Sequence, residues 1–166
     1  LWGAGQMMFN KYLVITPEKT NLRSKEEIFN LLRGLDPKRN LIWSEGILDV
    51  LDHATATTGY GSKLAIDLTD IVPTEKPEKS LAPRTAHPIG GVRLFNTEFY
   101  DDFGLLILYA EPEWRESIDV EAYLEENNIL NTKYVALFDH GAAGYMTPSD
   151  LLWLAAANTD PKRDIR

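Results

Sequence analysis

Apolar positions along the chain fall into short continuous runs separated by stretches with helical spacing. Runs rich in β-branched and aromatic residues predict strands at 11–16, 40–44, 64–68, 92–95, 104–110 and 133–138. Between the first two runs, residues 24–35 place apolar side chains on one face from Ile28 to Leu35, which predicts a helix. Two more helices are expected to begin at Asp119 and Thr147, because both residue types cap helix N-termini. Strands alternating with helices predict an α/β fold, a three-layer α/β/α sandwich with a mixed central sheet.

The order of these elements predicts a single domain with three segments. The run at 104–110 is apolar throughout, so we expect it to be the central strand of the sheet. Residues 72–87 hold several prolines and charged residues and are predicted to form a surface loop. No linker divides the chain convincingly, so we expect one domain over 1–166. Its predicted segments are a core at 1–70, a loop-rich insertion at 71–103 and a second repeat at 104–166.

One pattern occurs twice and predicts a duplicated strand–helix–strand unit. The sequence KYLVI at 11–15 is followed later by KYVALF at 133–138, and the tetrapeptide DPKR occurs at 36–39 and 160–163. Counted back from the two tetrapeptides, the preceding helices align without a gap. The alternative is chance reuse of a common helix–turn–strand pattern. The second copy reaches only Arg166, so we expect its closing strand to be missing or disordered. The apolar start at 1–9 favours a domain cut from a longer polypeptide.

The acidic composition excludes several classes of partner. A net charge of -8 repels nucleic-acid phosphates and anionic lipid headgroups, so neither is an expected partner. The chain has no cysteine, which excludes disulfides, thiolate nucleophiles and zinc–thiolate sites and fits a reducing compartment. Its apolar runs are shorter than the ~20 residues of a transmembrane helix. An acidic substrate would need a local basic pocket.

Candidate catalytic and metal-binding residues form no motif that specifies a reaction. His53, His87 and His140 are too scattered for a metal-ligand pair, although His140 follows a predicted strand, where ligands often bind. A loop role for His140 is the alternative. The glycine-rich run GYGSK at 59–63 lacks the Walker pattern and is expected to form a tight turn. The pair Asp101–Asp102 is expected in a solvated loop. The residues alone therefore predict no catalytic residue and no metal site.

Two stretches nevertheless resemble a known family. Residues 1–15 (LWGAGQMMFNKYLVI) and 45–69, which contain LDHA followed by GYGSKLAIDLT, are similar to the C-terminal region of UbiD-type decarboxylases. The helix and DPKRN turn between them occur in the same order in that family. The resemblance covers residues 1–70 and fades beyond Asp70. It departs from the family pattern at Ala54–Thr55–Ala56 and Asp67–Leu68–Thr69, so the resemblance specifies the fold and not the exact substrate.

The resemblance implies an activity for a longer protein. Members resemble 3-polyprenyl-4-hydroxybenzoate carboxy-lyase of ubiquinone and menaquinone biosynthesis and remove a carboxylate from aromatic or unsaturated acids. They are cytoplasmic enzymes that use prenylated FMN, Mn²⁺ and K⁺, bound by an upstream domain together with the catalytic residues. For this chain the family implies pocket wall and homo-oligomer contacts, without activity of its own. It also implies a substrate-pocket role for Ile47 and Leu48; the alternative is that both are core residues.

Two other functions compete with a decarboxylase domain. A non-catalytic oligomerisation or assembly module would use the apolar N-terminal stretch for subunit association. A self-standing nucleotide-binding protein would need a strand–turn–helix context that neither glycine motif has. The sequence does not select the exact substrate, the oligomer size or the pathway.

Overall fold

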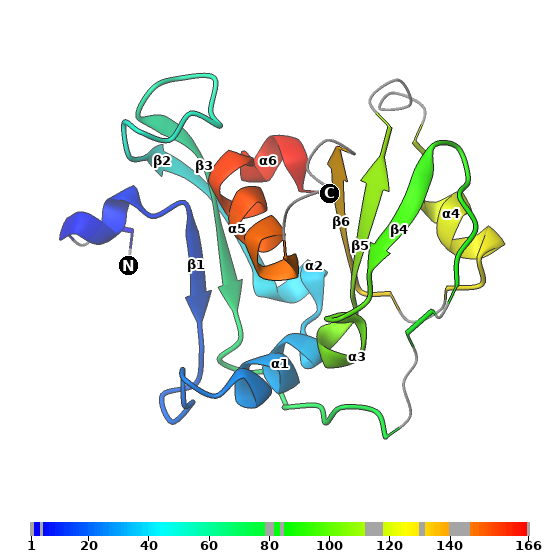
Figure 1. The fold of residues 1–166 in the computed structure, drawn as a ribbon. Helices are drawn as coiled ribbons and strands as arrows, with labels where there is room; N and C mark the ends of the chain where they lie inside the picture. Colours follow the sequence, from blue (N-terminus) through cyan, green and yellow to red (C-terminus); the bar gives the residue numbers. More distant parts are fainter. Residues whose placement is uncertain are drawn as a thin grey trace. The chain divides into compact units, whose positions relative to one another are not determined.

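The computed structural model describes residues 2–3, 5–78, 82–83, 85–111, 118–129, 132–139 and 147–165. These residues form two compact units (Figure 1). Unit 1 comprises 1–23, 34–72 and 152–166, and unit 2 comprises 24–33 and 73–151. His140 lies outside the described residues. The two units are described in turn.

Unit 1 is built on a three-stranded mixed sheet. Strand β3 (Tyr60–Asp67) lies between β1 (Tyr12–Ile15) and β2 (Leu41–Ile47). It pairs in parallel with β1 and antiparallel with β2, and residues 48–59 connect β2 to β3. The short helices η1 (Gly5–Phe9), α2 (Pro37–Asn40) and α6 (Pro161–Asp164) belong to the same unit, with most of α5 (Pro148–Asn158).

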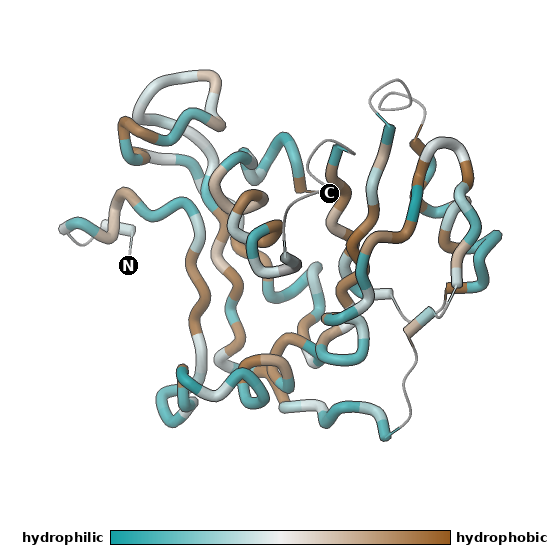
Figure 2. The backbone as a smooth tube through the Cα atoms, viewed as in Figure 1, coloured by the Kyte–Doolittle hydropathy of each residue, from teal (hydrophilic) through white to brown (hydrophobic). Residues whose placement is uncertain are grey.

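Unit 2 contains the second mixed sheet. Strand β5 (Leu105–Ala110) lies between β4 (Val92–Asn96) and β6 (Tyr134–Asp139), antiparallel to the first and parallel to the second. All six residues of β5 are buried, which confirms its predicted central position. The helices of this unit are α1 (Lys25–Gly34), α3 (Tyr100–Phe103) and α4 (Val120–Glu126). Figure 2 shows hydrophobic residues concentrated on the strands.

Two helices, α4 and α1, pack against other elements of unit 2. Tyr123 of α4 is fully buried and packs in one cluster with Leu106 and Leu108 of β5. Phe29 of α1 stacks on Phe103, with 4.9 Å between ring centroids. The hydroxyl of Tyr134 on β6 donates to the backbone carbonyl of Leu32 in α1 at 3.1 Å. These contacts explain why α1 belongs to this unit.

The helices are exchanged between the units. Helix α1 follows β1 in the sequence, yet it belongs to unit 2. The end of α5 and all of α6 follow β6, yet they belong to unit 1. Each sheet is therefore completed by a helical segment that follows a strand of the other sheet.

The α/β class with mixed sheets is confirmed, but the expectation of a single central sheet is wrong. The described strands form two sheets of three strands each. The reason is pairing, which apolar periodicity does not encode: β4 pairs with β5 and not with any strand of unit 1. The three-layer arrangement stays a prediction, as do the segment boundaries at 70 and 103.

Two local expectations also need correction. Strand β3 begins at Tyr60, so Gly61 lies within the strand rather than in a turn. Within the run 59–63, Gly59 has the left-handed conformation that a tight turn requires, with a φ of +73°. Asp101 and Asp102 lie in helix α3 and not in a loop.

The two DPKR tetrapeptides have the same local structure. Asp36 and Asp160 are both extended N-cap residues whose carboxylates accept backbone N–H groups of α2 and α6. The N–H of each aspartate donates in turn to the side chain four residues on, at 2.9 Å to Asn40 and 2.8 Å to Asp164. This likeness favours a repeated helix–turn element. Duplication of the complete strand–helix–strand unit stays a prediction.

Candidate functional site

The connection between β2 and β3 carries the residues that the sequence singled out. Ile47 at the end of β2 lies opposite Tyr60 at the start of β3, and Leu48 N–H donates to the carbonyl of Gly59 at 2.9 Å. Within the connection, the carboxylate of Asp49 accepts from Leu51 N–H at 2.8 Å. We call residues 48–59 the pocket loop.

Ile47 and Leu48 have opposite environments. The side chain of Ile47 is half exposed, whereas that of Leu48 is buried. The Cδ1 atom of Leu48 lies so close to Gly61 that a Cβ on Gly61 would be 2.9 Å from it. The sequence predicted one role for both residues, but successive residues in extended backbone point to opposite faces of the sheet.

Exposed apolar side chains gather on the same hairpin end. They belong to Ile47, Val50, Leu51 and Tyr60, and we call them the apolar rim. Tyr60 was not a predicted site residue, because the glycines beside it indicated a turn. The strand register places Tyr60 opposite Ile47, and this register cannot be read from the sequence.

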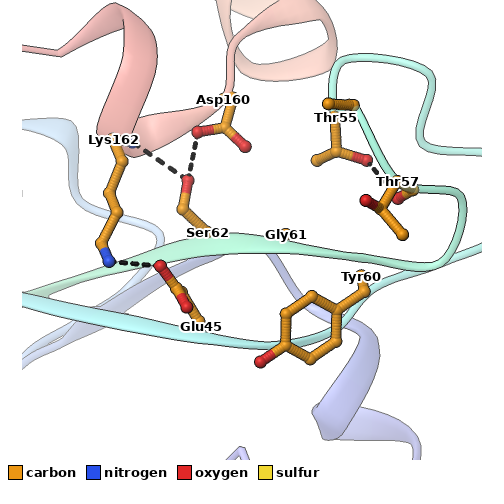
Figure 3. Close-up of a pocket in the computed structure, with 9 residues that line it drawn as sticks. Glu45, Thr55, Thr57, Tyr60, Gly61, Ser62, Asp160 and Lys162 are labelled. Atoms are coloured by element: carbon orange, nitrogen blue, oxygen red, sulfur yellow. Dashed lines mark hydrogen bonds and ion pairs between the residues drawn. The ribbon is translucent and has the colours of Figure 1, made fainter.

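A hollow of about 240 Å³ lies beside the pocket loop (Figure 3). It is lined by Glu45, Thr55, Ala56, Thr57, Tyr60, Gly61, Ser62, Asp160 and Lys162. The lining thus combines the β2–β3 hairpin with residues of the second DPKR tetrapeptide. Figure 3 shows the threonines and Tyr60 on one side and the charged residues on the other, with Gly61 between them.

The charged and polar groups that line the hollow are bonded within it. The hydroxyl of Ser62 donates to the carboxylate of Asp160 and accepts the N–H of Lys162 at 3.0 Å. The ammonium of Lys162 pairs with Glu45. Burial alone would raise the pKa of Asp160, but hydrogen bonds from Ser62 and from backbone N–H groups outweigh it and lower that pKa. Asp160 is therefore ionised at neutral pH and acts as an acceptor.

Two lysines fix the beginning of unit 1. The ammonium of Lys11 lies 2.9 Å from the carboxylate of Asp52 in the pocket loop, and both side chains are nearly buried. The ammonium of Lys63 donates to the backbone carbonyls of Met8 and Asn10 and lies 5.7 Å from the centroid of the Trp2 ring. Burial lowers the pKa of Lys63. These contacts tie the segment before β1 to the hairpin.

Replacing Gly61 with alanine is expected to destabilise unit 1 by about 1–3 kcal/mol, the usual cost of overpacking. A Cβ there would lie 2.3 Å from Cγ2 of Thr55 as well as against Leu48. Thermal unfolding followed by circular dichroism measures the loss. The control is Gly3→Ala, because no atom lies within 4 Å of a Cβ at Gly3. Equal stability of the two variants would contradict the close packing described.

The other candidate residues do not come together. Asp102 pairs with Lys76 at 2.6 Å, and the carboxylate of Asp101 accepts the N–H of Ala82. Within the described parts of the chain, no three His, Asp or Glu residues gather as metal ligands. Among those same residues, no helix combines the length and the apolar character needed to cross a bilayer.

Comparison with known proteins identifies part of the chain. Residues 1–68 match the family model of the 3-octaprenyl-4-hydroxybenzoate carboxy-lyase C-terminal domain. Two Helicobacter pylori proteins, from strains J99 and 26695 and both named as uncharacterized, are each 28% identical over 99% of this chain. An uncharacterized Aquifex aeolicus protein is 36% identical over 42% of the chain.

The match has defined limits. The chain spans about a quarter of the length of the Helicobacter pylori proteins, since the alignments cover 27% of each. The family match includes β1, β2, the pocket loop and β3, and it ends before unit 2 resumes at residue 73. Residues 1–68 are therefore similar to the C-terminal domain of the UbiD-type carboxy-lyase family.

Proposed function

We propose that this chain is the C-terminal part of a longer non-oxidative decarboxylase acting on aromatic or unsaturated carboxylic acids. The observation that supports it is the apolar rim, which exposes Ile47 and Tyr60 within the family-matched segment. Apolar side chains suit the flat body of an aromatic acid. They also keep water from the electron-rich centre left when carbon dioxide departs. A polyprenyl-4-hydroxybenzoate of quinone biosynthesis is one such acid.

In this proposal the two predicted residues act differently. Ile47 contacts the substrate from the rim, and Leu48 supports the pocket loop from beneath. The backbone hydrogen bond from Leu48 to Gly59 holds the end of the loop next to Ile47. The contribution of the chain is to bind and orient the substrate and to exclude water. No proton transfer is assigned to it.

The resemblance implies prenylated FMN, Mn²⁺ and K⁺ for the full-length enzyme. The described residues do not fit a site for these groups. They contain no cluster of metal ligands, and the charged groups of the hollow already have partners: Lys162 pairs with Glu45, and Asp160 accepts the hydroxyl of Ser62. We therefore assign the cofactor and metals to the upstream domain. That domain also supplies the catalytic residues.

The test of this proposal uses the full-length protein with Ile47→Ala. We expect KM for aromatic acids to rise by roughly tenfold, the effect of losing about 1.5 kcal/mol of apolar contact. Release of carbon dioxide from a panel of aromatic acids measures it. The control is Leu22→Ala, since Leu22 is also exposed in the family-matched segment but belongs neither to the apolar rim nor to the edge strands. A protein that decarboxylates no acid of the panel, or equal effects of the two variants, would contradict the proposal.

An assembly role is the second candidate function. Val14, Ile42 and Trp43 are exposed on β1 and β2, which are the edge strands of their sheet. Apolar side chains on exposed sheet edges favour association with another chain. We propose a homo-oligomer on this basis. Light scattering that finds a strict monomer at high concentration would count against it.

A further inference from the structure

The second DPKR turn, residues 159–165, contacts every strand of its sheet and the pocket loop. Thr159 shares a hydrogen bond with the Tyr12 hydroxyl on β1. Asp160 accepts from Ser62 on β3, and Lys162 pairs with Glu45 on β2. Arg163 donates through Nη1 to the carbonyl of Ala54 in the pocket loop at 2.9 Å. This short turn lies outside the family match, yet it forms hydrogen bonds or ion pairs with four segments within it: β1, β2, β3 and the pocket loop.

The first DPKR turn provides an internal comparison. Its backbone follows the same course, with Asp36 capping α2 as Asp160 caps α6. The carboxylate of Asp36 accepts from Lys38 N–H at 3.0 Å, which is a bond within the turn. Among the described residues, the side chains of Lys38 and Arg39 have no hydrogen bond or ion pair with another element. The contacts of the second turn therefore do not follow from its local fold.

Arg163 is held in place for its contact with the loop. Its Nε donates to one carboxylate oxygen of Asp164 at 2.7 Å, and its Nη2 donates to the other at 2.5 Å. This bond to Arg163 is the main cause of the lowered pKa of Asp164. A bidentate hydrogen bond of this kind fixes the plane of the guanidinium. The remaining nitrogen, Nη1, is the donor to Ala54.

We propose that Arg163 is a positioning residue for the pocket loop, so that the second DPKR turn sets the shape of a site in the family-matched segment. The loop runs directly between Ile47 and Tyr60, and its carbonyl at Ala54 is fixed by a group outside the family match. The effect on substrate rests on the proposed function. The effect on the loop does not.

The first test measures backbone amide hydrogen exchange in the purified chain. Arg163→Ala is expected to speed exchange of residues 50–57 roughly three- to tenfold, as expected for one charge-assisted hydrogen bond that is partly exposed. The matched control Arg39→Ala is expected to leave it unchanged. Asp164→Asn, which frees the guanidinium, is expected to reproduce the effect. Arg163→Lys is expected to restore part of the protection.

Three outcomes would overturn the proposal. One is unchanged exchange of the loop in both Arg163→Ala and Asp164→Asn. Another is an equal increase in Arg39→Ala. The third is a uniform increase over all amides of unit 1, which would show a loss of global stability instead of local positioning.

The second test uses the full-length protein. Arg163→Ala is expected to raise KM for an aromatic acid several-fold while kcat is retained, and Arg39→Ala to leave both unchanged. A fall in kcat with KM unchanged would contradict the positioning role. If the protein decarboxylates no aromatic acid, the proposed function fails, whereas the hydrogen-exchange result still decides the role of Arg163 in the loop.

Discussion

Replacing Asp52 with alanine is expected to destabilise unit 1 by about 3–5 kcal/mol, because it leaves the Lys11 ammonium buried without its counter-charge. The two groups are 2.9 Å apart, and both side chains are about nine-tenths buried. Their contact is an ion pair outside hydrogen-bond geometry, so Asp52 supplies charge compensation for Lys11 rather than a directional bond. Urea denaturation measures the loss, and amide exchange assigns it to unit 1.

Two comparisons make this prediction specific. Lys76→Met removes one partner of the exposed pair with Asp102 and is expected to cost less than about 1 kcal/mol. The double variant Lys11→Met with Asp52→Leu is expected to recover much of the stability, because no unpaired charge remains buried. Asp52 also accepts the N–H of Ala54, so the recovery should be incomplete. Similar losses for the buried and the exposed pair would contradict the role of burial.

Replacing Leu108 with alanine is expected to cost about 2–5 kcal/mol through lost apolar contact and a new cavity. Leu108 is 0% exposed at the centre of β5. Its partner across the ladder is Leu137, which is 39% exposed. Leu137→Ala is therefore the matched control and should cost clearly less. Thermal and urea unfolding of the two variants provide the measurement, and equal losses would show that unit 2 is not centred on β5.

The strands and helix starts could be predicted because their signals are local. The continuous apolar run at 104–110 predicted a central strand, since a strand buried on both faces has no polar positions. Asp119 predicted the start of α4, where its carboxylate accepts the N–H of Ala122 at 2.9 Å. In both cases neighbours in the sequence supply the physical cause.

The pairing of elements could not be predicted in the same way. The apolar face of residues 24–35 showed that α1 must pack on something, but not that its partner is the sheet of unit 2. The glycine at 61 indicated a turn, whereas the neighbouring Thr55 and Leu48 leave no room for a Cβ on β3. Such packing depends on residues that meet only after folding.

The candidate site was predicted in part. The family pattern led to Ile47 and Leu48, although it gave no reason to separate their roles. Alternation along β2 could have suggested opposite faces for them. The contacts of Asp160 and Arg163 with Ser62 and Ala54 carry no sequence signal, because a DPKR turn looks the same whether or not it meets another segment.

The exchange of helices has a consequence for the order in which the chain can fold during synthesis. The strands of unit 1 leave the ribosome before those of unit 2. The helix α6, which belongs to unit 1, is synthesised only after β4, β5 and β6. Helix α1 is made early and has no sheet to pack on until unit 2 appears. Neither unit is formed by one continuous stretch of the chain. We therefore expect late, joint folding of the two units, with a long nascent stage in which apolar strand edges need protection by chaperones.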